Sequence, residues 1–408
     1  MLWLFRSILV LFFFTGIIIY TGFRLFAFGK LFLPSLKRRF FWPIYIGFSY
    51  SFIVLAFFRL DRIPLIRLAG MYLLPFFIYL FGFIFLFDLV SLIFLLLQRI
   101  TRRTGRRPVK IMPAGTGIAL ALTLFLLLYG SFHAKDIRTV YRTVILPGAA
   151  LGNQGVKNSS SAPETENFRI VLVSDLHIGP TVGKKWTSRI IGCINKTEPD
   201  MVCIAGDIFD NGLDGVKDLK GITAELKRIK APLGVYACPG NHDTNRRAVS
   251  MEDIARFLSE AGIKLLVDEA VSLQPANGKP GVIVAGRRDA RPIGMKSGRL
   301  SIEELAASLQ SSGVIPKPLL ILLDHQPVEL PQAAQAGFDL VLCGHTHRGQ
   351  FFPGNLFTSS IFEKAGGTHY GLWQQGNTQA IVSSGAGVWG PPIRIASDSE
   401  IVVLDLQL

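Results

Sequence analysis

The sequence predicts two parts: an all-α membrane domain of four transmembrane helices, followed by a layered α/β domain. Three observations carry this prediction. Half of the 408 residues are hydrophobic and only 18% are charged, which is too apolar for an ordinary soluble protein of this length. The apolar excess lies in the first 110 residues, where Phe, Leu and Ile dominate. From Phe168 onward, short apolar runs alternate with helical stretches, as in an α/β domain.

The domain boundaries follow from this change in composition. We expect the membrane domain to cover residues 1–136 and the α/β domain to cover residues 137–408. Within the second domain, residues 149–167 are rich in Ser, Asn and Gly, so we expect a polar loop or linker there.

Four stretches in the first domain are long and apolar enough to cross a membrane, which takes roughly 20 residues. They are Ser7–Phe28, Phe40–Phe58, Met71–Leu97 and Ile111–Phe132. The first stretch is long, lacks a small-residue cleavage site and precedes three more spans. We therefore expect it to be a retained helix and not a signal peptide.

The net charge of +14 belongs to the membrane domain. Residues 1–142 hold 18 Lys and Arg against 3 Asp and Glu, while the rest of the chain holds 25 basic and 26 acidic residues. The positive charge therefore lies where it would meet anionic lipid and set the topology. This distribution disfavours a nucleic acid partner.

The basic residues between the spans also predict an orientation. Eleven Lys and Arg residues lie around the first and third loops, against seven on the opposite side. The positive-inside rule then places those two loops in the cytoplasm and the α/β domain outside. Asp88 lies inside the third span, without a basic partner visible in the sequence. It is either a functional carboxylate, or it is protonated or paired with a neighbouring helix.

The elements of the second domain follow from hydrophobic periodicity. Residues 137–146 alternate as an edge strand does, and Ser301–Gln310 begins with a capping-box pattern of Ser301 and Glu304. We expect further strands at Arg169–Ser174, Met201–Ala205, Gly234–Cys238, Lys264–Val267, Val282–Ala285, Leu319–Leu323, Leu340–Cys343, Ala380–Ser384 and Ile401–Leu406. We expect further helices at Lys184–Lys196 and Asp214–Lys230.

Polar motifs stand where five of these apolar strands end. They are Asp175-Leu176-His177, Gly206-Asp207, Gly240-Asn241-His242-Asp243, His325 and Gly344-His345-Thr346-His347. Ligand sites of α/β sheets form at the carboxyl ends of strands, so the five motifs can converge. A spacing of two in extended backbone puts both side chains of a pair on one face. One such motif is common by chance, but five in this order are not.

The residue types indicate a metal site. Carboxylate, imidazole and amide oxygen suit Mn, Fe or Zn better than Ca, and no thiolate is among them. None of the four cysteines forms a Cys-x-x-Cys pair, and three of them, Cys203, Cys238 and Cys343, lie in apolar runs as buried hydrophobic residues do. Two metal ions about 3.5–4 Å apart, joined by a bridging carboxylate, would bind a phosphoryl group and activate a water molecule.

These motifs resemble the calcineurin-like metallophosphoesterase superfamily, and most closely its membrane-attached bacterial branch. The resemblance covers roughly residues 137–408 and implies a four-layer α/β/β/α sandwich. It implies two divalent ions, one held by Asp175, His177 and His347, the other by Asn241, His325 and His345, with Asp207 bridging them. It also implies that His242 contacts phosphate and protonates the leaving group, that Asp243 orients His242, and that Asp210 braces the site.

Two positions depart from the family pattern. Asp324 precedes His325 at a position open to many residues, and Arg348 stands where relatives often carry Gly. Arg348 points at substrate phosphate, at solvent or into a structural salt bridge; we favour the last two.

The sequence thus predicts a hydrolase of phosphate mono- or diesters that uses a metal-activated hydroxide. Its membrane spans suggest a lipid or envelope substrate and a place in a bacterial inner membrane. The alternative is an inactive membrane scaffold or sensor with the same fold.

Overall fold

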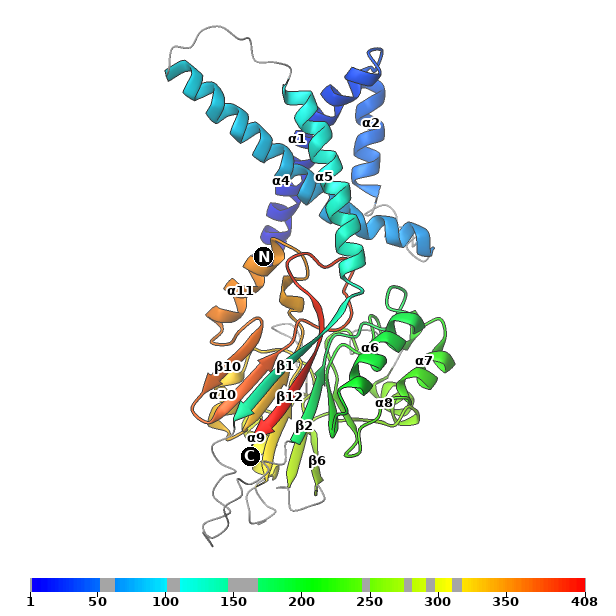
Figure 1. The fold of residues 1–408 in the computed structure, drawn as a ribbon, viewed down its shortest axis with the longest axis vertical. Coiled ribbons are helices and arrows are strands. Elements are labelled where there is room, and N and C mark those ends of the chain that lie inside the picture. Colours follow the sequence, from blue (N-terminus) through cyan, green and yellow to red (C-terminus); the bar gives the residue numbers. More distant parts are fainter. Residues whose placement is uncertain are drawn as a thin grey trace, which may run out of the picture. The chain divides into compact units, whose positions relative to one another are not determined.

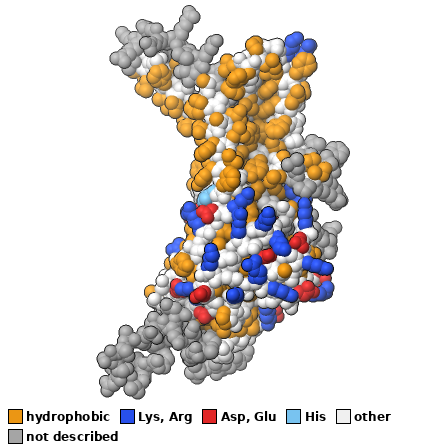
Figure 2. Space-filling view, turned by 45° about the vertical axis from the view of Figure 1, so that its right-hand side comes forward, with side chains coloured by type: hydrophobic (Ala, Val, Ile, Leu, Met, Phe, Trp, Pro, Cys, Tyr) orange, Lys and Arg blue, Asp and Glu red, His pale blue; other side chains and the backbone are white. Residues whose placement is uncertain are grey.

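The computed structural model describes residues 2–51, 63–100, 111–145, 168–243, 250–274, 281–290, 298–309 and 318–407. The chain divides into two compact units, Met1–Gly130 and Ser131–Leu408. Apolar side chains cover the helices of the first unit, whereas Lys, Arg, Asp and Glu side chains are scattered over the second (Figure 2).

The first unit is helical. Its helices are α1 (Leu2–Phe32), α2 (Arg38–Ser49), α4 (Pro64–Ile100) and most of α5 (Ile111–His133). Among the described residues, three segments are long and apolar enough to span a membrane: Leu11–Phe32, Ile66–Gln98 and Ala114–His133. The fourth predicted span stays a prediction, because α2 has only 12 residues and part of Phe40–Phe58 lies outside the described residues.

Asp88 in α4 has the basic partner that the sequence did not reveal. Its Oδ1 lies 2.7 Å from Arg24 Nη2, and the Tyr20 hydroxyl donates a hydrogen bond to its other oxygen. Arg24 is one of the eleven basic residues expected around the first and third loops, but α1 continues to Phe32 and carries Arg24 inside the helix. Asp88 is therefore paired with a neighbouring helix, which supports the structural interpretation of this carboxylate.

The second unit is a mixed α/β domain with two six-stranded sheets (Figure 1). The first sheet has the order β1-β12-β2-β3-β4-β5, with strands Ile137–Ile145, Ser399–Gln407, Phe168–Val173, Met201–Ala205, Val235–Cys238 and Ile263–Leu265. The second has the order β10-β11-β9-β8-β7-β6, with strands Gly371–Gln375, Thr378–Val382, Leu340–Cys343, Leu319–Leu323, Val282–Gly286 and Glu269–Leu273. The predicted edge strand at residues 137–146 is confirmed as β1, which lies at the edge of the first sheet beside β12.

Alternate residues of the central strands face different cores. In β2, Ile170 and Leu172 pack with residues of the second sheet, while Val171 and Val173 pack with helices α6 (Lys184–Lys196), α7 (Leu219–Leu226) and α8 (Met251–Glu260). The outer face of the second sheet packs with α9 (Ile302–Leu309) and α10 (Leu330–Gln335). Because both faces of each sheet pack against a core, the central strands read as continuous apolar runs and not as an alternation of apolar and polar residues.

Helix boundaries show where periodicity alone misleads. The helix predicted at Asp214–Lys230 is shorter, because Asp218 caps α7 by accepting a hydrogen bond from Gly221 N. The capping box at Ser301 and Glu304 is confirmed by reciprocal hydrogen bonds of 2.8 and 3.0 Å. Helices α8, α10 and α11 (Gly354–Lys364) were not predicted.

Candidate metal centre

The five polar motifs follow the carboxyl ends of strands that are neighbours in the two sheets. The first three motifs follow β2, β3 and β4, which are adjacent and parallel in the first sheet. His325 follows β8, and the final motif follows β9, its parallel neighbour in the second sheet. Loops from both sheets therefore meet at one place, as the strand-end argument requires.

Two pairs of histidine nitrogens face each other at short range. His177 Nε2 lies 3.0 Å from His347 Nε2, and His325 Nε2 lies 3.3 Å from His345 Nδ1. Asp175 Oδ1 lies 3.4 Å from His347 Nε2. Each pair thus combines a residue from a loop after one strand with a residue from the β9 loop.

Asp207 lies between the two histidine pairs. Its Oδ2 is 3.2 Å from His325 Nε2 and 3.6 Å from His177 Nε2. Its Oδ1 accepts a hydrogen bond of 2.8 Å from the backbone N–H of His242, which fixes the carboxylate. One oxygen of this carboxylate is therefore within reach of both histidine sets.

These distances fit metal coordination. Two imidazole nitrogens at about 2.0–2.1 Å from one ion, separated by roughly tetrahedral to octahedral angles, lie about 2.9–3.4 Å apart. Both observed nitrogen pairs fall in that interval. Three groups of possible ligand atoms lie within 4.8 Å of one another: Asp175, His177 and His347; His177, Asp207 and His242; and Asp207, His325 and His345. Asn241 lies in the loop after β4, next to His242, and its amide oxygen is shielded from solvent.

Contacts behind the histidines select the nitrogen that faces the centre. His325 Nδ1 donates to the carbonyl of Ala205 at 2.8 Å, which leaves Nε2 with a lone pair for an ion. His177 Nδ1 lies 3.6 Å from Asp210 Oδ1. The Ala205 carbonyl holds the His325 ring in the tautomer that a metal ligand needs, and the Asp210 carboxylate lies behind the His177 ring at ion-pair distance.

The backbone at the site is strained. Five candidate ligands have positive φ angles between 47° and 72°: Asp175, His177, Asp207, His345 and His347. Such angles are uncommon outside glycine and gather at functional sites. Glycine is required beside them, because a Cβ at Gly240 would lie 2.2 Å from Asp207 Oδ1.

Burial and mutual charge define the electrostatics. Burial opposes ionisation of Asp207, but the charge of His325 and its hydrogen bond outweigh it and lower the pKa of Asp207. Burial also lowers the pKa of His345, to about 3, and the charge of His325 adds to this effect. Without ions, the centre therefore contains a buried Asp207–His325 ion pair, and His345 is neutral and ready to act as a ligand.

The contacts of Asp243 favour a role other than the predicted one. It was predicted to orient the His242 ring, but its oxygens accept backbone N–H bonds from Ile208, Phe209 and Gly240 at 2.8–3.1 Å. The His242 ring is instead held by the carbonyl of Asp210, 2.7 Å from Nδ1. Asp243 shapes the loops after β3 and β4, and burial together with the charge of Asp207 raises its pKa to about 7.

Sequence reasoning also missed Arg394, which is fully buried beside His347. Its Nη1 donates to the His347 carbonyl at 3.1 Å, and its Nη2 lies 3.3 Å from His347 Nδ1. Nη2 also donates to the carbonyls of Gly385 and Gly387. The only signal in the sequence is an Arg among apolar and Pro residues after the last motif, which by itself indicates no contact.

The two departures from the family pattern are structural. Asp324 is buried and pairs with Arg287 at 2.8 Å and Arg299 at 2.5 Å, so its position is not an open one. Arg348 stacks over the Tyr370 ring at 4.3 Å. This cation–π contact was not among the three alternatives that the sequence suggested, and it favours a structural role for Arg348.

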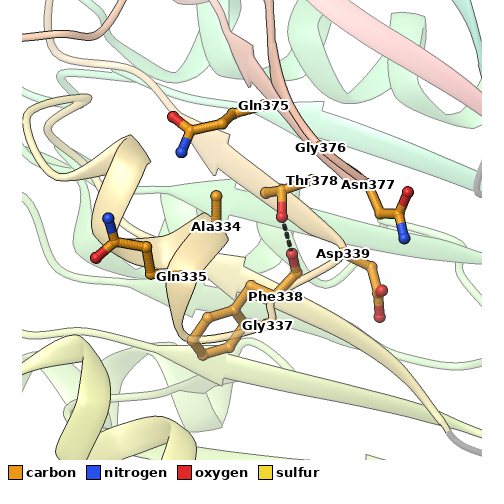
Figure 3. Close-up of a pocket in the computed structure, with 9 residues that line it drawn as sticks. All are labelled: Ala334, Gln335, Gly337, Phe338, Asp339, Gln375, Gly376, Asn377 and Thr378. Atoms are coloured by element: carbon orange, nitrogen blue, oxygen red, sulfur yellow. Dashed lines mark hydrogen bonds between the residues drawn. The ribbon is translucent and has the colours of Figure 1, made fainter.

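A separate cavity of about 330 Å³ does not belong to this centre (Figure 3). It lies where β9 and β11 begin, at the end of the second sheet opposite the ligand loops. Its lining includes Gln335, Asp339 and Asn377, and it contains none of the candidate ligands.

The fold and the site together define a candidate metal-binding α/β protein with histidine and aspartate clusters at the strand ends. The sequence profile of the calcineurin-like phosphoesterases matches residues 168–349. An uncharacterized metallophosphoesterase of Aquifex aeolicus is 31% identical over 248 residues, 60% of this chain and 87% of that one. The chain therefore belongs to the calcineurin-like phosphoesterase family.

Two further relatives are longer than the matched region. An uncharacterized metallophosphoesterase of Helicobacter pylori strain J99 is 34% identical over 246 residues, 59% of this chain and 60% of that one. A Danio rerio protein called "transmembrane protein with metallophosphoesterase domain" is 34% identical over 301 residues, 72% of this chain and 62% of that one. This chain thus spans about 60% of the length of these two relatives.

Proposed function

We propose that this protein is a membrane-bound phosphoesterase with two metal ions that hydrolyses a phosphate mono- or diester. The observation that carries the proposal is the position of Asp207 Oδ2, within 3.6 Å of one histidine pair and 3.2 Å of the other. A carboxylate placed between two ligand sets is the natural bridge of a binuclear site. The proposal includes the four-layer α/β/β/α order of the domain, which the three apolar cores support.

The ligand assignment follows the two histidine pairs. Asp175, His177 and His347 would hold one ion, and Asn241, His325 and His345 would hold the other, with Asp207 shared. The ions, Mn, Fe or Zn by their donor set, would supply Lewis-acid charge and activate a water molecule for attack at phosphorus.

His242 is the proposed proton donor. Its Nδ1–H is held by the Asp210 carbonyl, so the ring is fixed with Nε2 directed elsewhere. Its ring centroid lies 4.8 Å from that of His177, which places it beside the ligand set. A protonated Nε2 could therefore deliver a proton to the leaving oxygen of a bound ester.

The test uses purified protein with Mn²⁺ and chromogenic phosphate mono- and diesters. We expect turnover in the wild type and its loss in Asn241→Ala and His242→Ala. Asn377→Ala, a change in an exposed turn, is the matched control and should keep full activity. Equal turnover in all four proteins would contradict the residue assignment. A wild type that binds Mn²⁺ but hydrolyses neither ester class would favour the scaffold or sensor.

The location and orientation are also proposals. The three candidate spans support a membrane protein, and we propose a bacterial inner membrane with the catalytic unit facing outward. The orientation depends on the number of spans: four place both ends of the chain on one side, and three place them on opposite sides. A reporter enzyme fused after Gln407 should be active outside the cell, and activity restricted to a cytoplasmic reporter would reverse the orientation.

A further inference from the structure

Helix α11 carries its apolar side chains outward. Leu356, Phe357 and Ile361 are 58%, 67% and 63% exposed, and Phe352, just before the helix, is 48% exposed. Phe362 is the only buried residue of α11. A surface helix of a soluble domain normally shows the reverse pattern, with its apolar stripe facing the core. We call these four exposed residues the α11 face.

The opposite side of α11 adjoins the metal centre. The Phe362 ring lies 6.0 Å from the ring of His345, a candidate ligand. The short turn His347–Gly349 leads directly into the segment before α11, where Phe351 N donates to the Gly349 carbonyl. An exposed Trp389 ring also lies 6.1 Å from the His242 ring. The exposed apolar side chains of α11 and of Trp389 are thus separated from the candidate ligands by no more than the width of one helix.

The residue before α11 and the last residue of α5 both contact the segment 394–398. Phe352 N donates to the Ile395 carbonyl at 3.0 Å, and His133 Nδ1 lies 3.1 Å from the carbonyl of the preceding residue, Arg394. His133 Nε2 also lies 2.9 Å from Asp398 Oδ1. His133 is the last residue of the candidate span Ala114–His133. If α5 crosses a bilayer, its last turn lies at the bilayer surface, and so does the beginning of the α11 face.

We infer that α11 is an interfacial helix whose exposed face embeds in the bilayer that α5 crosses, so that the metal centre meets phosphoester headgroups of membrane lipids. Aromatic and aliphatic side chains on one helix face are the groups that enter the boundary between headgroups and acyl chains. Lys364, exposed at the end of the same helix, can extend its ammonium to lipid phosphate. The lipid substrate class rests on the proposed function, whereas the embedding of α11 does not.

The first experiment measures embedding without any reaction. The full chain is placed in phosphatidylcholine nanodiscs after Cys193→Ser, which removes the one cysteine that is not buried. A fluorophore is attached at Ser360→Cys, an exposed position on α11, or at Ser259→Cys, an exposed position on α8. We expect brominated lipids to quench the α11 label severalfold more than the α8 label. Equal quenching at both positions overturns the inference. So does an α11 label that a second copy of the chain shields from the brominated lipids.

The second experiment measures the substrate class. Phosphatidic acid in nanodiscs is compared with a soluble chromogenic monoester, for the wild type, Phe357→Asn and a control, Leu219→Asn, at a partly exposed Leu of α7. We expect Phe357→Asn to lose on the order of ten-fold on the lipid and to keep its soluble turnover, since one large apolar group leaves the interface. A loss that is equal on both substrates, or absent on both, overturns the lipid substrate class.

The two experiments separate the inference from the proposed function. Strong quenching at the α11 label with no turnover of any ester means that α11 embeds but the proposed function fails. Turnover of soluble ester without selective quenching means that the phosphoesterase stands and the inference fails.

Discussion

Replacing Arg394 by Met should destabilise the second unit and weaken metal binding together. Arg394 is fully buried and donates hydrogen bonds to three backbone carbonyls, those of His347, Gly385 and Gly387, at 2.7–3.1 Å. Burial lowers the pKa of its guanidinium to about 10, while nearby carboxylates led by Asp175 oppose the shift, so the group is charged at neutral pH. Met fills a similar volume but offers no donor.

The size of the effect follows from those carbonyls. Each buried acceptor left without a donor costs about 1–3 kcal/mol. Three such losses, partly offset by no longer burying a cation, amount to about 3 kcal/mol. A unit of this size loses roughly 2–4 °C in Tm per kcal/mol, so we expect Tm to fall by roughly 6–12 °C. Because His347 loses its support, Mn²⁺ affinity should fall about 10–100-fold.

The assay combines thermal melts in detergent with Mn²⁺ titration of the same preparations. Arg228→Met is the matched control, because Arg228 is 56% exposed and its ion pair with Glu225 lies at the surface. That control should change stability by less than about 1 kcal/mol and leave Mn²⁺ affinity unchanged. An Arg394→Met protein with wild-type Tm and Mn²⁺ affinity would refute the reasoning.

Three further predictions test separate features. Gly240→Ala should abolish Mn²⁺ binding, because its Cβ would lie 2.2 Å from Asp207 Oδ1, whereas Gly183→Ala, with open space around it, should bind normally in the same titration. Burial raises the pKa of Asp289 from 3.8 to about 6, so its contribution to stability is complete below about pH 4 and is lost, by up to about 3 kcal/mol, as the pH rises through 6. Asp289→Asn should therefore flatten the fall of Tm between pH 4 and 7 in chelator, and an unchanged slope would contradict this. Asp88→Asn and Arg24→Met should each lower the stability of the protein in detergent, as measured by its melting temperature. The loss of stability in the double variant should be about 1 kcal/mol smaller than the sum of the two single losses. Strictly additive losses would argue against the ion pair between Arg24 and Asp88.

Most strand positions were predictable because they depend on local pattern, although β6 and β10 were not predicted. The alternation from Ile137 and the apolar run before Asp175 each mark a strand in the printed sequence, and β1 and β2 occur there. The convergence of the ligand motifs followed from one rule about strand ends. No further geometric information was needed to predict that the candidate ligands lie close together.

Contacts between distant loops were not predictable in the same way. Asp243 is next to His242 in sequence, but its carboxylate turns toward Ile208 and Phe209, which are more than 30 residues away. Arg394 reaches His347 across 47 residues. Helix α11 was missed because its apolar residues face outward, so its pattern does not mark a packed face. These features depend on tertiary packing, which periodicity does not encode.

The strained ligand loops require contacts elsewhere in the fold to hold them in place. A non-glycine residue with positive φ costs on the order of 1 kcal/mol, and five candidate ligands have this conformation. The sum is comparable with the net stability of a typical domain, so other contacts must offset it. The loops supply them: Asp175 N donates to the Gly206 carbonyl, His177 N to the Asp207 carbonyl, and Gly344 N to the His325 carbonyl. Because these bonds join the ligand loops to one another, the chelated protein should keep its folded centre, unlike small zinc domains that unfold without metal.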